Sequence, residues 1–249
     1  MPQLLKFKIK ILIFILPLLI FSCDENSNPV ADRSIFPSAD NGLKILALGD
    51  SYTIGESVSE RDRWPNQLSD SIKYYNLDVD EVRIVAQTGW TTGDLINAIN
   101  NQTIQNNYDL VGLLIGVNNQ FQGRSLNEYQ NQFQQLLENA ISFANNDTGR
   151  VFVFSIPDYS VTPTGGQFGG GNTAEEIDNF NVVNRQITEQ FNVPYFNITP
   201  ISRSAAINPD LIATDGLHFS GKMYSLWVEF ILADILSKLL TIENSILNL

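Results

Sequence analysis

The sequence predicts an α/β domain in which helices cover both faces of one parallel sheet. Short apolar runs alternate with longer segments whose apolar residues recur at steps of three and four, as in repeated strand–helix pairs. The run Leu110–Ile115 is almost wholly apolar, which is typical of a central parallel strand. The chain has 249 residues, which suits one such domain preceded by a leader.

Five strands and five long helices are expected in alternation. The predicted strands are Lys44–Leu48, Val82–Ala86, Leu110–Ile115, Val151–Ile156 and Tyr195–Ile198. The predicted helices are Trp64–Tyr75, Thr92–Gln105, Ser125–Ala144, Ala174–Phe191 and Lys222–Leu240. Repeated strand–helix units place their strands in parallel, and ligands then bind beyond the carboxyl ends of those strands.

Local signals support the helix starts. Pro65 suits the first turn of its helix, where a missing N–H costs nothing. Thr91 and the residue after it are both candidates for the N-cap of the second helix. Ser125, followed three residues later by Glu128, matches a capping box at the start of the third helix.

The N-terminus has the pattern of a secretory signal. Lys6, Lys8 and Lys10 precede the apolar stretch Ile11–Phe21, which is too short for a typical membrane span. A small residue, Ser22, follows it. We therefore expect residues 1–22 to be a signal peptide that directs export.

Cys23, the only cysteine, lies where a bacterial lipoprotein signal places its acylated residue. The run Ile20–Cys23 resembles a loose lipobox, although an ordinary signal peptide that ends near a cysteine would look similar. We expect a lipid anchor at Cys23, a flexible tether over residues 23–42 and a folded domain over residues 43–249. The expected location is a membrane, on the periplasmic side or at the cell surface.

The charge balance is strongly acidic. The formal net charge is −12, and without the three leader lysines it is −15. This balance argues against nucleic acid and anionic lipid surfaces as partners. Metal binding is not expected, because the chain has one histidine, no thiol beyond Cys23 and no dense carboxylate cluster.

Nucleophilic hydrolysis is indicated by two short segments far apart in the chain. Ser51 follows Gly49 at the end of the first predicted strand, and His218, the only histidine, follows Asp215 by three residues. An imidazole can remove the serine proton near neutral pH while a carboxylate holds its Nδ1–H. Each residue alone has a common structural explanation, such as a helix cap, but together they favour a catalytic set. Because position 53 is threonine, the Gly-x-Ser-x-Gly motif of α/β-hydrolases is absent.

Two further residues are candidates for stabilising an oxyanion. Gly89 follows the second predicted strand, and a glycine N–H can approach a substrate without obstruction by a Cβ. Asn118 follows the third strand, and its side-chain amide is a neutral donor. A turn glycine and an Asx-turn asparagine are the ordinary alternatives for these positions.

These residues resemble the signature of the SGNH hydrolase superfamily, also called GDSL esterases and lipases. The matching blocks are Gly49-Asp50-Ser51, Gly89, Gly116-x-Asn118 and Asp215-x-x-His218. The resemblance implies a flavodoxin-like three-layer α/β/α fold with a mainly parallel five-stranded sheet. It also implies Ser51 as nucleophile, His218 as base, Asp215 as its orienting partner, and an oxyanion hole from Ser51, Gly89 and Asn118.

One position departs from the family pattern. The third block usually reads Gly-x-Asn-Asp, and here Asn119 replaces the aspartate. Because Asn118 carries the donor, we expect this change to alter the hydrogen bonds around the site and to leave activity in place.

The sequence thus predicts a cofactor-free serine esterase that acts on short-acyl or acetyl esters, with acylated glycans among the candidate substrates. A lysophospholipase, a thioesterase and a non-catalytic surface binding lipoprotein are the alternatives. The glycine-rich run 165–171 fits no phosphate-binding motif and is expected to be a mobile loop near the site.

Overall fold

The computed structural model describes residues 42–168 and 171–247. The predicted signal peptide, Cys23 and nearly all of the predicted tether lie outside the described residues. The strands are β1 Leu43–Gly49, β2 Val79–Ala86, β3 Leu110–Leu114, β4 Val151–Phe154 and β5 Tyr195–Phe196. They form one sheet in the order β2-β1-β3-β4-β5, and every neighbouring pair is parallel.

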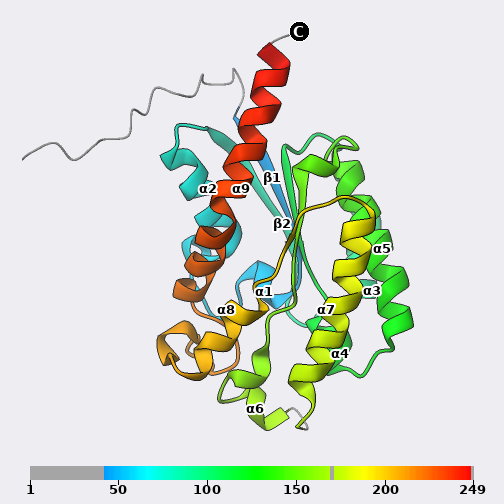
Figure 1. The fold of residues 1–249 in the computed structure, drawn as a ribbon, viewed down its shortest axis with the longest axis vertical. Helices are drawn as coiled ribbons and strands as arrows, with labels where there is room; N and C mark the ends of the chain where they lie inside the picture. Colours follow the sequence, from blue (N-terminus) through cyan, green and yellow to red (C-terminus); the bar gives the residue numbers. More distant parts are fainter. Residues whose placement is uncertain (1–41, 169–170, 248–249) are drawn as a thin grey trace, which may run out of the picture. The chain divides into compact units, whose positions relative to one another are not determined.

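Long helices cover both faces of the sheet (Figure 1). On one face α2 packs against α9, and on the other α5 packs against both α3 and α7. Their bounds are α2 Trp64–Tyr74, α3 Thr92–Asn100, α5 Leu126–Phe143, α7 Thr173–Gln190 and α9 Gly221–Leu247. The three-layer α/β/α prediction is confirmed. No helix within the described part of the chain is long and apolar enough to cross a membrane.

Shorter helical segments occupy the connections. The short α-helices are α1 Ser51–Ile54, α4 Val117–Phe121, α6 Gly165–Phe168 and α8 Thr199–Arg203. The 3-10 turns are η2 Glu60–Asp62, η3 Thr148–Arg150, η4 Tyr159–Val161, η5 Ser204–Ala206 and η6 Pro209–Leu211. The prediction of a loop over residues 165–171 was therefore wrong for its first four residues, which form α6.

Three elements, β4, β5 and α3, end earlier than predicted, because other hydrogen bonds replace those that would continue them. After β4, the Ile156 N–H and carbonyl bond to the Asn181 side chain instead of a neighbouring strand. Beyond β5, the Ile198 N–H turns back to the Phe196 carbonyl. The helix α3 ends at Asn100, since its C-cap Asn101 closes the last turn.

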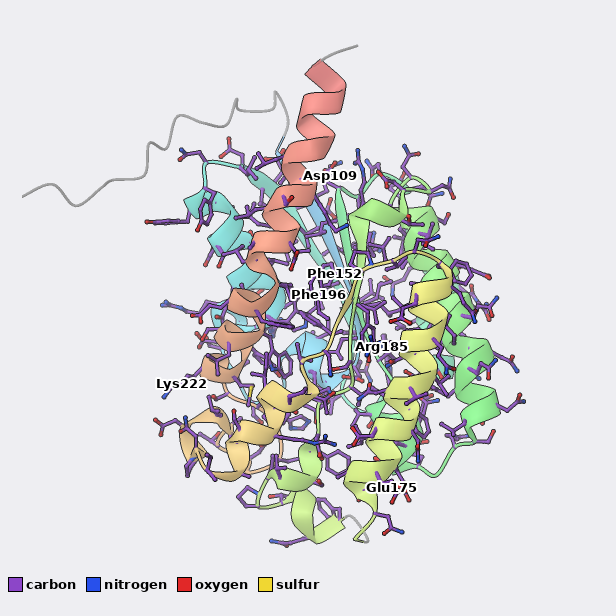
Figure 2. The ribbon with its side chains drawn as sticks, in the orientation of Figure 1. Asp109, Phe152, Glu175, Arg185, Phe196 and Lys222 are labelled. Carbon is purple, nitrogen blue, oxygen red and sulfur yellow. The ribbon has the colours of Figure 1, made fainter. Side chains whose placement is uncertain are left out.

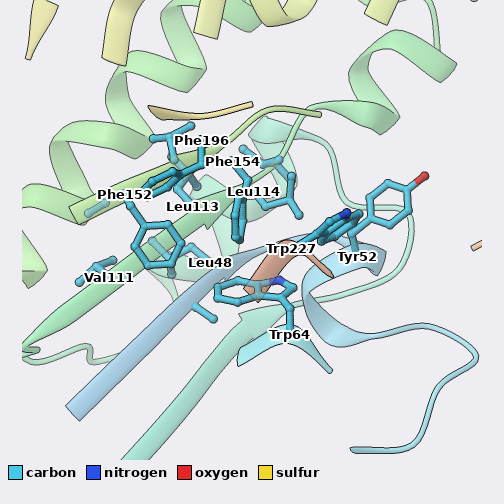
Figure 3. Packing of buried hydrophobic residues seen from close by; sticks show 14 of the residues in the cluster. Leu48, Tyr52, Trp64, Val111, Leu113, Leu114, Phe152, Phe154, Phe196 and Trp227 are labelled. Carbon is cyan, nitrogen blue, oxygen red and sulfur yellow. The ribbon is translucent and has the colours of Figure 1, made fainter. Parts of the chain in front are cut away.

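An aromatic core packs β3 and β4 against α2. Figure 2 shows Phe152 and Phe196 inside the protein, between its layers. Trp64 from α2 is fully buried and lies edge-on to Phe152 and to Phe154, with ring centroids 5.9 and 5.3 Å apart (Figure 3). A Cβ on Gly112 in β3 would lie 2.7 Å from the Trp64 ring, so glycine lets this ring pack against the strand.

Candidate active site

The strand register brings three loops to one edge of the sheet. Gly49, the last residue of β1, pairs with Ala86 of β2 on one side and with Leu114 of β3 on the other. The loops that follow these three strands therefore start at the same level. They carry Ser51, Gly89 and Asn118 in turn.

These loops surround a hollow of about 140 Å³. Ser51, Gly89, Asn118 and His218 all line it. Four residues that the sequence singled out from separate regions of the chain thus lie around one cavity. Asp215 is bonded to His218, one of these lining residues.

Ser51 is the first residue of α1 and is almost completely buried. The turn from β1 into α1 is tight, because a Cβ on Gly49 would collide with Thr53 and with the Leu114 carbonyl. Asp50 caps the helix, and its Oδ1 accepts a hydrogen bond of 3.1 Å from the Tyr52 N–H. The geometry presents the serine directly beyond the end of β1, which lies between β2 and β3 in the sheet.

Asp50 is a buried carboxyl beside this serine, with only 1% of its surface exposed. Burial raises the pKa of Asp50 to about 7, although backbone N–H groups of Tyr52, Gly116 and Asp50 itself act in the opposite direction. Its Oδ2 is buried and has no hydrogen-bond partner within the described residues. The carboxyl therefore changes charge near neutral pH.

His218 and Asp215 are paired on a turn before α9. The distance from His218 Nδ1 to Asp215 Oδ2 is 2.6 Å, and Asp215 Oδ1 accepts the backbone N–H groups of Leu217 and His218. Gly216, at a φ of 70°, allows the tight turn. The His218 ring also lies edge-on to Tyr52, with 5.9 Å between centroids, so both neighbours orient the imidazole.

Ser57 is a site residue that sequence reasoning missed. Its Oγ donates a 2.7 Å hydrogen bond to Asp215 Oδ2, the oxygen that also contacts His218. Partial burial acts to raise the pKa of Asp215, but hydrogen bonds from His218, Leu217 and Ser57 outweigh it and hold the pKa well below its usual range. Nothing in the local sequence around Ser57 indicates a contact to a residue so distant in the chain.

The two candidate oxyanion donors have suitable local geometry. Gly89 has a φ of 85°, and a Cβ at this position would meet nothing within 4 Å, because open space lies there. Asn118 Nδ2 donates a 2.9 Å hydrogen bond to the Trp90 carbonyl. This bond uses one amide hydrogen and fixes the orientation of the other.

Asn119, the departure from the family pattern, is fully buried behind the site. Its Oδ1 accepts from the Thr92 N–H at 2.9 Å, and its Nδ2 donates to Thr92 Oγ1 at 2.7 Å. The Thr92 hydroxyl in turn donates to Gln132. The side chain thus ties the loop after β3 to the start of α3. In the part of the chain that the structure describes, no three or more histidine, cysteine or acidic side chains gather as metal ligands would.

Most of the chain matches a known protein family. A model described as the GDSL-like lipase/acylhydrolase family matches residues 47–226. The chain belongs to this family. The match runs from the end of β1 into α9 and includes both proposed catalytic segments. It makes the chain a hydrolase that acts on ester bonds. The predicted SGNH/GDSL classification is confirmed.

Solved structures of GDSL-like enzymes share the fold. A lipase/acylhydrolase from Enterococcus faecalis matches with a TM-score of 0.61 and 20% identity over 78% of this chain and 95% of that one. The esterase EstA from Pseudoalteromonas sp. has a TM-score of 0.59 and 19% identity, covering 78% and 97%. A variant of an acetyl xylan esterase from Geobacillus stearothermophilus has a TM-score of 0.61 and 18% identity, covering 78% and 95%. No curated protein sequence matched. The roles assigned to individual site residues stay predictions.

Proposed function

We propose that this GDSL-like hydrolase cleaves carboxylic esters with short acyl groups, with Ser51 as nucleophile, His218 as general base and Asp215 as its orienting carboxylate. The observation that carries the proposal is the arrangement of His218. Its Nδ1 is bonded to Asp215, and its ring lines the same hollow as Ser51. The low pKa of Asp215 keeps this carboxylate ionised, which favours the Nδ1–H tautomer and leaves Nε2 free to accept a proton.

The proposed reaction has two stages. Ser51 Oγ attacks the ester carbonyl while His218 Nε2 takes its proton, and His218 then protonates the leaving alcohol oxygen as the carbon–oxygen bond breaks. Water, deprotonated by His218, next attacks the acyl-serine and releases the carboxylic acid. General acid–base participation of this kind contributes a factor of roughly 10²–10⁴.

The negative oxygen of each tetrahedral intermediate would be stabilised by three donors. These are the backbone N–H groups of Ser51 and Gly89 and the side-chain amide of Asn118, all of which line the hollow. None of them can take the proton that His218 must carry. A single donor of this type is worth roughly 10²–10³ in turnover.

The preference for short acyl groups rests on the size and lining of the hollow. Its volume of about 140 Å³ is small, and the apolar residues Tyr52, Val117 and Leu217 form part of its wall. An acyl chain of a few carbons would fit, and a long one would project into solvent. Acetyl xylan esterases among the solved structures with this fold point in the same direction.

The decisive experiment is hydrolysis of p-nitrophenyl esters of increasing acyl length by the purified protein. We expect activity on the acetyl ester, falling with chain length, and loss of that activity in Ser51→Ala. Ser59→Ala, which changes an exposed serine bonded to Asp62, is the matched control. Activity that survives in Ser51→Ala would refute the mechanism. A preference for long chains would instead support a lysophospholipase.

Labelling with a fluorophosphonate separates catalysis from the alternative of a non-catalytic binding protein. Only an activated serine reacts with such a probe. Wild-type protein and Ser59→Ala should be labelled, and Ser51→Ala should not. Failure to label the wild-type protein would favour the binding-only alternative.

We further propose that the enzyme is exported and anchored through acylation of Cys23, on the sequence pattern of residues 1–23. An acyl anchor would hold the domain at a membrane without a spanning helix. Growth with a radiolabelled fatty acid tests the proposal. Label should enter the wild-type protein and be absent from Cys23→Ser, and equal labelling of both would refute it.

A further inference from the structure

A second hollow, of about 320 Å³, adjoins the first. Phe121 at the end of α4 and Tyr159 in η4 line both, so the two hollows share a wall. The remaining lining residues come from α4 and the turn after it, from the end of α6, and from residues 171–176 at and just before the start of α7, near the ends of α4 and α6 in Figure 1. Only the second hollow reaches the volume usual for small-molecule sites, ~300 Å³ and above.

Two exposed aromatic rings stand on the wall of the second hollow. The side chain of Phe121 is 54% exposed and that of Phe168 is 58% exposed, although exposing such rings to water is unfavourable. The rings lie edge to face, with centroids 6.1 Å apart. They offer an apolar surface to a ligand that enters from the first hollow.

Polar groups form another part of the lining. Glu176 on α7 is exposed, and its Oε2 accepts a 2.7 Å hydrogen bond from Gln120 Nε2. Gln120 is only 7% exposed, so its amide holds the Glu176 carboxylate in place. The remaining lone pairs of the carboxylate stay available to a ligand. Asn172 is also part of the lining. None of the described residues that line this hollow is lysine or arginine.

We propose that the second hollow binds the alcohol portion of the ester, and that this alcohol is a neutral sugar ring. The inference rests on the proposed function, because it extends the same site from the acyl group to the leaving group. A pyranose has the required mixture of surfaces. Its C–H faces would pack against Phe121 and Phe168, and its hydroxyl groups would donate to the Glu176 carboxylate.

Other leaving groups fit this lining less well. A phosphorylated alcohol would face the Glu176 carboxylate without any cationic partner among the lining residues, which is unfavourable. A purely hydrocarbon alcohol would leave Glu176 and Asn172 facing an apolar surface, and burying polar groups without partners is costly. A neutral polyol satisfies both parts of the lining.

The first test compares two kinds of acetate ester, both built on a six-membered ring, as substrates of the purified full-length protein. Mono-O-acetylated methyl glucosides and xylosides carry ring hydroxyl groups, and cyclohexyl acetate carries none. We expect kcat/KM for at least one sugar ester to exceed that for cyclohexyl acetate by about tenfold or more, because binding of the leaving group lowers the barrier. Equal values, or a preference for cyclohexyl acetate, would overturn the proposal.

The second test uses matched variants. Glu176→Ala and Phe168→Ala should each lower the ratio of kcat/KM for the sugar ester to that for p-nitrophenyl acetate, by about tenfold for the lost charged acceptor. Glu175→Ala, at the adjacent exposed position on α7 labelled in Figure 2, should leave the ratio at the wild-type value. Phe230→Ala, which removes another exposed ring on α9, should do the same.

The outcomes distinguish the sugar site from the esterase activity. If wild-type protein cleaves p-nitrophenyl acetate but Glu176→Ala and Phe168→Ala keep the wild-type ratio, the sugar site is refuted and the esterase stands. If Ser51→Ala cleaves p-nitrophenyl acetate as fast as wild type, the proposed function itself fails. The ratio is insensitive to partial unfolding, because unfolded protein lowers both rates equally.

Discussion

Ser57 Oγ lies 2.7 Å from Asp215 Oδ2, the oxygen that His218 Nδ1 contacts at 2.6 Å. Ser57 and Asp215 are 158 positions apart in the chain. Ser57 has a φ of 63°, a left-handed conformation that is unfavourable for serine. A strained residue that bonds to the partner of the proposed base is a strong candidate for a positioning role.

We therefore predict that Ser57→Ala lowers kcat about fivefold to tenfold, because Asp215 loses one of the hydrogen bonds that hold its carboxylate in place. The lost bond also raises the pKa of Asp215 toward its usual value, so activity should fall off at a higher pH on the acid side than in wild type. A pH profile of kcat for an aryl acetate measures both effects.

Two further variants separate positioning from stability. Ser57→Gly also removes the hydroxyl but suits the positive φ, so it should lose activity like Ser57→Ala while melting at a higher temperature. Ser59→Ala removes a hydroxyl that bonds to Asp62 and should retain wild-type kcat. If Ser57→Ala keeps the wild-type pH profile, the contact has no part in catalysis.

Gly89→Ala tests the proposed backbone donor. The added Cβ meets no other atom within 4 Å, so a loss of activity would come from the φ of 85° and from the methyl group entering the substrate space. We predict a decrease in kcat/KM of roughly 10²-fold. Gly123→Ala introduces the same kind of strain, at a φ of 65° and with equally free surroundings, and its effect on aryl ester hydrolysis should be smaller. Equal losses would argue against Gly89 as a donor.

Asn119→Asp, which restores the residue usual in the family, should destabilise this protein. The buried amide donates to Thr92 Oγ1 and accepts from the Thr92 N–H, and an ionised carboxylate can only accept. The Thr92 hydroxyl would have to turn away from Gln132, which would lose its donor. We predict a decrease of about 1–3 kcal/mol in the free energy of unfolding, measured with urea. Asn106→Asp, at an exposed position, is the control.

The raised pKa of Asp50 makes the stability of the folded protein depend on pH. Its pKa is about 7 in the folded protein and about 4 in the unfolded chain, so the folded state binds more protons between these values. Stability from this group is complete below about pH 4 and is lost as the pH rises toward 7. The expected loss between about pH 5 and pH 8 is on the order of 3 kcal/mol.

Asp50→Asn should remove this decline, because an amide does not titrate while its oxygen can still accept the Tyr52 N–H. Urea unfolding of wild type and variant across that pH range is the measurement. Asp70→Asn makes the same chemical change at an exposed position on α2 and serves as the control. An unchanged slope in Asp50→Asn would mean that the carboxyl does not titrate in this range.

The main elements of the fold could be predicted because their signals are local. Periodicity located all five strands and the long helices. It misplaced some of their ends, where side-chain or local backbone hydrogen bonds replace the expected ones, as the Asn181 side chain does after β4. The short helices α1, α4, α6 and α8 carry too few residues to show a period. Their positions depend on the connections in which they lie.

The amino-acid sequence by itself determined the class of chemistry, since a single histidine and the residue types at four separated positions restricted the choice of base, nucleophile and donors. Only the tertiary structure decided what surrounds them. The bond from Ser57 to Asp215, the pairing of Asn119 with Thr92 and the joined hollows at Phe121 each depend on segments distant in the chain. Periodicity and capping rules describe neighbours along the backbone, whereas these contacts arise from packing a whole sheet and its helices together.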